Sequence, residues 1–197
     1  MQEINFILTC EGTSDANLVE HLKNLLIQRG ADEVSGQHAD LSILRKPPGG
    51  SVREKLNAIN ELYPEANVVF IHRDADNQGA EERANEIKEQ SENFPKTTIP
   101  LIPVKITETW LLADKEKITE ITGVEPNNIP PLKNLEKSGR AKEILMDCLT
   151  SGVKKKQKKT TFYRARAQLC QELRPEGPVS MLASYNAFTQ KIDELFL

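Results

Sequence analysis

The chain has 197 residues, of which 38% are hydrophobic and 5% aromatic, and 26 Lys and Arg against 29 Asp and Glu give a net charge of −3. This length suits one large domain or a domain with an appendage, and the apolar fraction can fill a core, which excludes intrinsic disorder and a coiled coil. No segment approaches the roughly 18 apolar residues of a membrane helix, and no basic stretch precedes the first apolar run, so we expect a cytoplasmic protein with no membrane partner.

The first quarter of the chain alternates between strand and helix patterns. Residues 4–9 form an apolar run that predicts a buried strand, and Ser14 or Asp15 can then cap a helix whose leucines recur at helical spacing up to Gly30. Residues 41–44 predict a second short strand before a Pro-Pro-Gly-Gly turn.

The same alternation continues over the next fifty residues. Ser51 can cap a helix that runs to residue 62, and residues 67–72 form a third apolar strand, followed by a charged helix at 78–91. The fourth strand, at 98–106, contains two prolines, which favours an edge position. The pattern predicts an α/β fold with a mostly parallel sheet of about four strands flanked by helices.

Beyond Thr107 the strand patterns end and helical patterns follow. We expect helices at 108–114, 115–121, 140–149, 162–173 and 179–195, with connectors at 126–132 and 153–161. The sequence therefore predicts an α/β core over residues 1–107 and a C-terminal helical extension over residues 108–197 that packs on the core.

Cysteines, histidine and tryptophan are all expected in the interior. Cys10, Cys148 and Cys170 are odd in number and far apart, which argues against a disulfide framework and a zinc site, so we expect buried thiols. His72 lies within the third strand and Trp110 begins a helix with two leucines, and both are predicted to pack in the core.

Charged residues follow each predicted strand. Glu11 follows the first strand, Asp74 and Asp76 the third and Glu108 the fourth, whereas Arg45 and Lys46 follow the second. Because the carboxyl ends of parallel strands share one edge, these side chains should meet there, with Asp74 and Asp76 pointing the same way in extended chain. Clustered carboxylates raise one another's pKa unless a cation lies between them, so we expect a Mg²⁺ site that also accepts Mn²⁺.

Two segments give this edge a family resemblance. The residues Glu11-Gly12-Thr13-Ser14-Asp15 and Asp74-Ala75-Asp76 resemble the Toprim domain of topoisomerases, primases and overcoming-lysogenization-defect nucleases. The segment 108–114, Glu-Thr-Trp-Leu-Leu-Ala-Asp, is similar to an element of a small bacterial Toprim-like family of unknown function. The resemblance covers residues 1–115.

The resemblance implies roles for individual residues. Glu11 would be the general acid/base or a metal ligand, Asp74 and Asp76 catalytic metal ligands, and Glu108 a further ligand or the carboxylate of a second metal. Asp15 is open between a helix cap and a position beside the metal, and Asp114 is expected to cap the next helix.

Positively charged residues supply the other half of the predicted site. Arg73 either pairs with the carboxylates or grips phosphate. Toprim nucleases often place a lysine near the metal, and Lys133, Lys137 and the lysines of 154–159 remain open for that role.

A basic segment stands out from the acidic remainder. Residues 154–166 contain seven basic residues and no acid; because the whole chain has a net charge of −3 and this segment carries +7, the remaining residues carry −10. The segment is either a solvated loop or a surface that binds phosphates. The predicted nucleic-acid-binding residues are Arg45, Lys46, Lys154, Lys155, Lys156, Lys158, Lys159, Arg164 and Arg166.

The sequence thus predicts metal-dependent phosphodiester chemistry on nucleic acid. We favour a Toprim-type nuclease that acts on DNA rather than RNA, with an ATPase partner, in phage defence or DNA repair; self-association as a homo-oligomer stays open. One alternative is a non-catalytic Toprim-like binding or regulatory module of an ATPase complex. The other is a phosphatase of the haloacid-dehalogenase type, although Asp76 precedes Asn77 and Gln78 instead of the Thr of that family.

Overall fold

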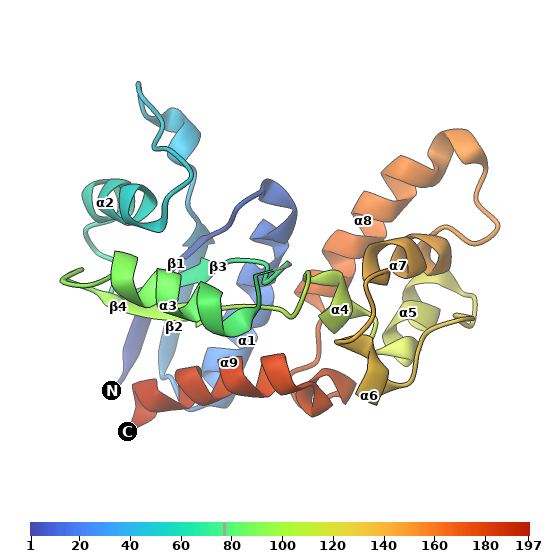
Figure 1. Cartoon of the computed structure of the whole chain (residues 1–197). Helices are drawn as coiled ribbons and strands as arrows, with labels where there is room; N and C mark the ends of the chain where they lie inside the picture. Colours follow the sequence, from blue (N-terminus) through green and yellow to red (C-terminus); the bar gives the residue numbers. More distant parts are fainter. Residues whose placement is uncertain (77) are drawn as a thin grey trace.

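The computed structural model describes residues 1–76 and 78–197 and contains a four-stranded sheet (Figure 1). Its strands are β1 (Glu3–Thr9), β2 (Glu33–His38), β3 (Val68–His72) and β4 (Thr97–Leu101). All neighbours pair in parallel in the order β2-β1-β3-β4, so β2 and β4 form the edges. The predicted α/β fold is confirmed, and so is the edge position of the proline-containing strand.

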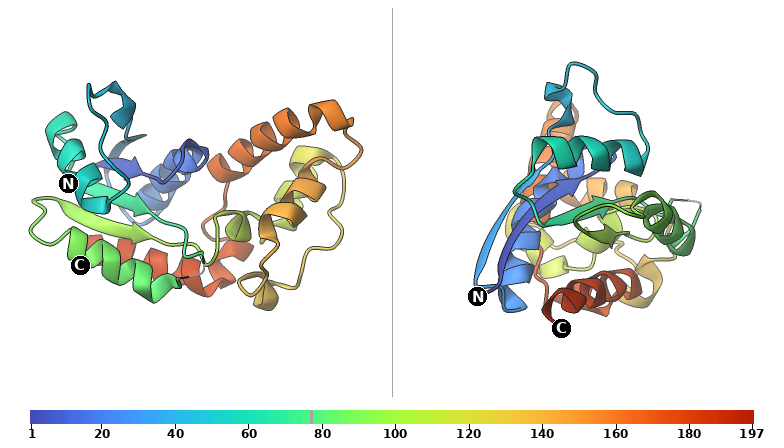
Figure 2. Two further views of the ribbon diagram at one scale, coloured as in Figure 1. Left: turned by 45° about the horizontal axis from the view of Figure 1, so that its top comes forward. Right: turned by 90° about the vertical axis from the view of Figure 1, so that its left-hand side faces the viewer.

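Helices flank the sheet and continue beyond it. Those of the described residues are α1 (Leu18–Gln28), α2 (Val52–Leu62), α3 (Ala80–Gln90), α4 (Glu108–Leu111), α5 (Lys115–Thr122), α6 (Leu132–Leu135), α7 (Ala141–Leu149), α8 (Lys158–Gln171) and α9 (Ala183–Asp193). In the right-hand view of Figure 2, α2 lies above the sheet and α9 below it. No helix of the described residues is long and apolar enough to cross a bilayer.

Alternating residues of the strands fill two separate cores. Phe6 and Leu8 of β1 pack on the face covered by α1 and α9, whereas Ile7 packs on the opposite face with α2 and α3. This alternation follows from the two-residue period of a strand, and it explains why β1 and β3, covered on both faces, read as continuous apolar runs.

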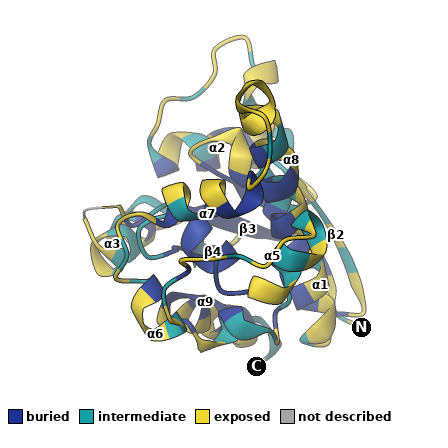
Figure 3. Cartoon of the chain, turned by 90° about the vertical axis from the view of Figure 1, so that its right-hand side faces the viewer, coloured by how far each residue is buried: buried dark blue, intermediate teal, exposed yellow. Residues whose placement is uncertain are grey.

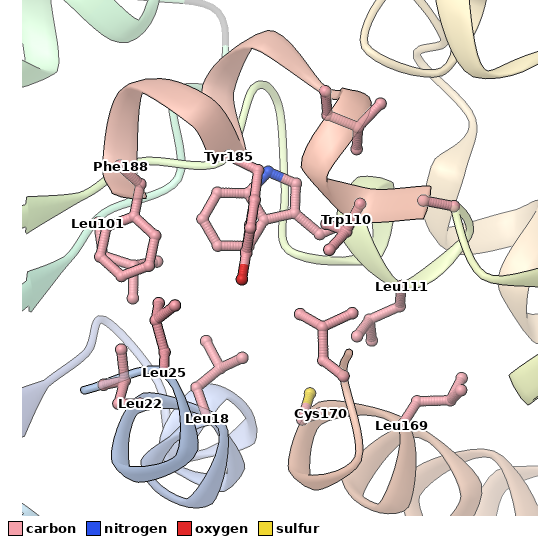
Figure 4. Close-up of a cluster of buried hydrophobic side chains, with 14 of the residues drawn as sticks. Leu18, Leu22, Leu25, Leu101, Trp110, Leu111, Leu169, Cys170, Tyr185 and Phe188 are labelled. Carbon is pink, nitrogen blue, oxygen red and sulfur yellow. The ribbon is translucent and has the colours of Figure 1, made fainter. Parts of the chain in front are cut away.

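The larger core joins the sheet to the C-terminal helices (Figure 4). Trp110 of α4 is fully buried, and its ring lies 5.1 Å from that of Tyr185 and 5.7 Å from that of Phe188, both of α9. Figure 4 shows leucines of α1 and Leu169 and Cys170 of α8 around the same cluster. The expected core position of Trp110 is confirmed, as are three free, buried cysteines.

The predicted second strand at 41–44 is wrong. The strand is β2 at Glu33–His38, and Leu41–Ile43 is a short 3₁₀ turn in which Asp40 accepts a hydrogen bond from Ser42 N. As an edge strand, β2 carries mostly polar residues, and its Gly36 lies opposite Phe6, where an added Cβ would come within 2.2 Å of the ring. Arg45 and Lys46 therefore lie in an exposed loop and do not directly follow a strand.

Helix starts agree with the sequence only in part. Ser51 Oγ accepts a hydrogen bond from Glu54 N and Asp114 from Lys117 N, so both predicted caps are confirmed. The predicted cap of α1 by Ser14 or Asp15 is wrong, because both residues lie in a 3₁₀ turn (Thr13–Asn17) before it.

The basic segment is partly helical, contrary to the predicted connector at 153–161. A 3₁₀ turn at Lys155–Gln157 leads into α8, which begins at Lys158 and extends away from the sheet (Figure 1). Figure 3, viewed from the side of the C-terminal helices, shows buried residues on their inner faces and exposed residues on their outer faces.

Candidate functional site

Carboxylates from five positions gather at the carboxyl edge of the sheet. Glu11 follows β1, Asp74 and Asp76 follow β3, Glu108 begins α4, and Asp15 lies in the 3₁₀ turn before α1. Burial and then the charges of the other four raise the pKa of Asp74, so all four lie near enough to act on this carboxylate. The structure thus brings together every carboxylate that the strand-end pattern singled out.

Arg166 lies between two of these carboxylates. Its Nε donates to Glu108 Oε1 at 2.9 Å, its terminal nitrogens donate to Asp15 Oδ1 and to the Ser14 carbonyl, both at 2.7 Å, and the side chains of Arg166, Asp15 and Glu108 are buried. Burial acts to raise the pKa of Asp15, but the interactions with His72 and with the Arg166 guanidinium outweigh it and lower the pKa. The structure places Arg166 in a buried ion-pair network and not on a surface that nucleic acid could reach.

Asp74 is the carboxylate without a compensating partner. Burial, followed by the charges of Asp15 and Glu108, raises its pKa to about 8. Its Oδ1 is inaccessible to solvent and has no hydrogen-bond donor among the described residues. An unpartnered, buried carboxylate oxygen among other carboxylates is costly unless the site receives a proton or a cation.

His72, predicted to be a packed core residue, is buried, and one of its two ring nitrogens has a hydrogen-bond partner. Its Nε2 lies 2.8 Å from Thr107 Oγ1, whereas Nδ1 has no hydrogen-bond partner within residues 1–76 and 78–197. Burial lowers its pKa, so the imidazole is neutral near pH 7 and does not neutralise Asp74.

Two arginines bind the remaining carboxylates nearer the surface. Arg73 contacts Glu11 Oε1 at 3.0 Å and Glu86 at 2.9 Å. Arg83 contacts Glu86 at 2.8 Å and the half-exposed Asp76 at 3.9 Å. Glu86 of α3 therefore holds both arginines beside the site.

Asp76 does not continue the strand as the sequence suggested. Its φ of +47° bends the chain, so Asp76 does not lie in the extended chain from which the common direction of Asp74 and Asp76 was predicted. Beside Asp76 lies a hollow of about 200 Å³ whose lining includes Lys105 and Ser138.

Lys55 is a residue at this edge that the sequence reasoning missed. It lies in α2, its Nζ donates to the Cys10 carbonyl at 2.8 Å, and burial together with the charge of Arg73 lowers its pKa. The available signal was its position: Lys55 lies in the first turn of a helix that follows a strand, and such helices begin at the carboxyl edge.

The other predicted cations lie on the surface. Arg45, Lys46, Arg164 and all five lysines of 154–159 are exposed. The lysines that form ion pairs in the described part of the chain are Lys23, Lys117 and Lys191, so the basic end of α8 has no acidic partner there.

The donor set fits a divalent cation at one position. Asp15 and Glu108 already have a counter-ion, because Arg166 bonds to one oxygen of each, whereas Asp74 offers a free oxygen, with Glu11 and Asp76 as further carboxylates. As these side chains stand, no three His, Cys, Asp or Glu residues among 1–76 and 78–197 are already arranged around a metal position. A cation at Asp74 would therefore draw Glu11 or Asp76 from its arginine.

Comparison with family models, curated proteins and solved structures yields no match. The Toprim resemblance stays a prediction that rests on the segments at 11–15, 74–76 and 108–114.

Proposed function

We propose that this chain catalyses metal-dependent hydrolysis of phosphodiester bonds in nucleic acid at the carboxyl edge of the sheet. The observation that supports this most is Asp74, whose buried Oδ1 has no donor among the described residues and whose pKa is raised to about 8 among four other carboxylates. Perturbed groups of this kind concentrate at sites that bind or react.

In this proposal Asp74 is the central ligand of Mg²⁺, with Glu11 and Asp76 as partners. Mg²⁺ prefers oxygen ligands and retains water, and when bound it orients a phosphate and lowers the pKa of bound water. The side chain of Glu11 is exposed, and it serves either as a ligand of the ion or, where Asp76 takes that place, as the general acid/base. Arg73 and Lys55, both beside Glu11, provide positive charge for a phosphate.

The basic end of α8 supports nucleic acid as the substrate class. Lysines concentrate at the amino-terminal end of this helix, where the helix dipole disfavours cations, and no acidic residue lies in its first turn. Such an arrangement does not stabilise the helix. Binding of an external anion is the simplest way to compensate the positive charge of these lysines. From Lys158 to Arg166 the helix rises about 12 Å, which places the lysines within a few nucleotides of the carboxylates.

A non-catalytic binding module is the second candidate. Arginines contact four of the five edge carboxylates, and such pairs can also serve as a static, structural network. In this case the site would bind an ATPase partner or nucleic acid without cleaving it.

A cleavage assay distinguishes the enzyme from the binding module. The purified full chain is incubated with supercoiled plasmid or with RNA, in Mg²⁺, Mn²⁺ or EDTA. We expect metal-dependent cleavage that Asp74→Asn and Glu11→Gln abolish, while Glu143→Gln, which changes an exposed carboxylate of α7, leaves it intact. Absence of cleavage in every metal would rule out the enzyme, and cleavage by the folded Asp74→Asn variant would rule out Asp74 as its metal ligand. Release of phosphate from a small phosphoester would favour the haloacid-dehalogenase alternative.

A further inference from the structure

Arg166 joins the helical extension to the carboxylate edge. It comes from α8, and its partners Asp15 and Glu108 precede α1 and begin α4. The Arg166 side chain is only 4% exposed, and each of its three guanidinium nitrogens donates to an oxygen of the network. Both carboxylates that are more than nine-tenths buried at this edge are therefore bound to one fixed positive charge.

The position of Arg166 is fixed by its helix. Phe162, Leu169 and Cys170 lie on the same face of α8 and are buried in the large core, so the packing of the helix holds the backbone of Arg166 beside the carboxylates. Its charge is also permanent, because guanidinium does not deprotonate in proteins.

The charges at the edge leave one group without a counter-ion. Arg166 pairs with both Asp15 and Glu108 and offsets one of their two negative charges, Arg73 contacts Glu11 and Arg83 contacts Asp76. No lysine or arginine of residues 1–76 and 78–197 forms an ion pair with Asp74, and the Nε2 of its neighbour His72 lies 3.8 Å from Asp74 Oδ1, beyond hydrogen-bonding distance. A divalent cation would compensate the charge of Asp74 and part of the charge of a neighbouring carboxylate.

We propose that Arg166 takes the place that a second metal ion would otherwise fill, so that the site accepts a single divalent cation at Asp74. This inference rests on the metal site of the proposed function and adds its stoichiometry. Arg166 is a positioning residue: it keeps Asp15 and Glu108 bound in the network, and Glu108 does not serve as the ligand of a second metal.

The first test counts Mn²⁺ bound to the full chain, by equilibrium dialysis with elemental analysis and by electron paramagnetic resonance. We expect one ion per chain, lost in Asp74→Asn, and no spin coupling between neighbouring ions. Two ions with spin coupling would overturn the inference while leaving the proposed function standing. No bound ion would overturn both, whereas one bound ion without nuclease activity would contradict only the proposed function.

The second test removes the guanidinium. In Arg166→Met the carboxylates of Asp15 and Glu108 lose their counter-ion, so we expect a second Mn²⁺ to bind and to raise the melting temperature more than in the natural chain. The triple variant Arg166→Met/Asp15→Asn/Glu108→Gln removes both signs of charge and should bind one ion again.

The Arg166→Met variant tests the inference even if it folds poorly without metal. If Arg166→Met folds only when Mn²⁺ is added, the ion is replacing the guanidinium and the inference is supported. If Arg166→Met folds and binds one ion with unchanged affinity, or the triple variant binds two, the inference is wrong. Arg166→Lys, which keeps the charge, should bind one.

Discussion

His72 Nε2 lies 3.8 Å from Asp74 Oδ1, beyond hydrogen-bonding distance, while the same nitrogen lies 2.8 Å from Thr107 Oγ1. The imidazole is therefore committed to Thr107, and within the described residues Asp74 has neither a donor nor a neutralising charge for its buried oxygen. Asp74 is therefore the carboxylate of this edge at which a bound cation would supply the missing interaction.

Asp74 should destabilise the metal-free fold as the pH rises. Its pKa is about 8 in the folded chain against 3.8 for an unperturbed aspartate, so between these values the unfolded chain binds fewer protons and stability falls with increasing pH. The decrease is at most about 1.4 kcal/mol per pH unit for one proton. Urea denaturation of Asp74→Asn should show no such decrease, and Mg²⁺ should reverse it in the natural chain; identical pH profiles for both proteins would contradict this role of Asp74.

His21 should produce the opposite slope in acid. Burial lowers its pKa to about 4 from 6.5, and its two ring nitrogens contact the Leu173 carbonyl and Tyr185 Oη at 2.9 and 3.0 Å. Because the unfolded chain binds more protons between these pKa values, stability should fall as the pH drops through this window, by about 3 kcal/mol in total. His21→Asn should remove most of this slope. A slope unchanged in that variant would show that His21 titrates normally.

Breaking the buried pair at Arg166 should be costly. Removing one partner of a buried ion pair typically costs about 3–5 kcal/mol, because the other charge stays buried. We expect such a decrease in the free energy of unfolding for Arg166→Met without metal, and a smaller decrease for the triple variant in which Asp15 and Glu108 are also neutral. The exposed pair of Arg140 and Glu143 supplies a control: Arg140→Met should change stability by less than about 1 kcal/mol.

The lysines of the α8 tip should determine the salt dependence of nucleic-acid binding. Changing the five lysines of 154–159 to Gln should flatten the plot of log affinity against log salt by about 0.9 for each duplex phosphate that the chain no longer neutralises. Changing the exposed Lys88, Lys115 and Lys142 to Gln is the control and should leave the slope unchanged. Equal slopes for the natural chain and the five-lysine variant would show that this segment is a solvated surface that does not bind phosphates.

Sequence patterns were sufficient where local physics decides the structure. The apolar runs of β1 and β3 and the leucines of α1 predict buried elements, since a sheet covered on both faces requires continuous apolar strands. The same logic located the carboxylates, because parallel strands end at one edge.

Long-range pairing was beyond local patterns. Arg166 and Asp15 lie 151 positions apart, and a basic residue within a basic segment was assigned to the surface by composition alone. A finer signal was present: Arg166 lies four residues after Phe162 and three before Leu169, on the apolar face of α8. Similarly, β2 escaped detection because an edge strand with a glycine beneath Phe6 has no apolar alternation.

The central claim is that a hard divalent cation binds at Asp74, and Mn²⁺ soaked into crystals of the full chain tests it most directly. We predict an anomalous difference peak within ligand distance of Asp74 Oδ1, with Glu11 or Asp76 turned from its arginine toward the ion. A saturated crystal with no peak there, or an identical peak in Asp74→Asn, would contradict the claim.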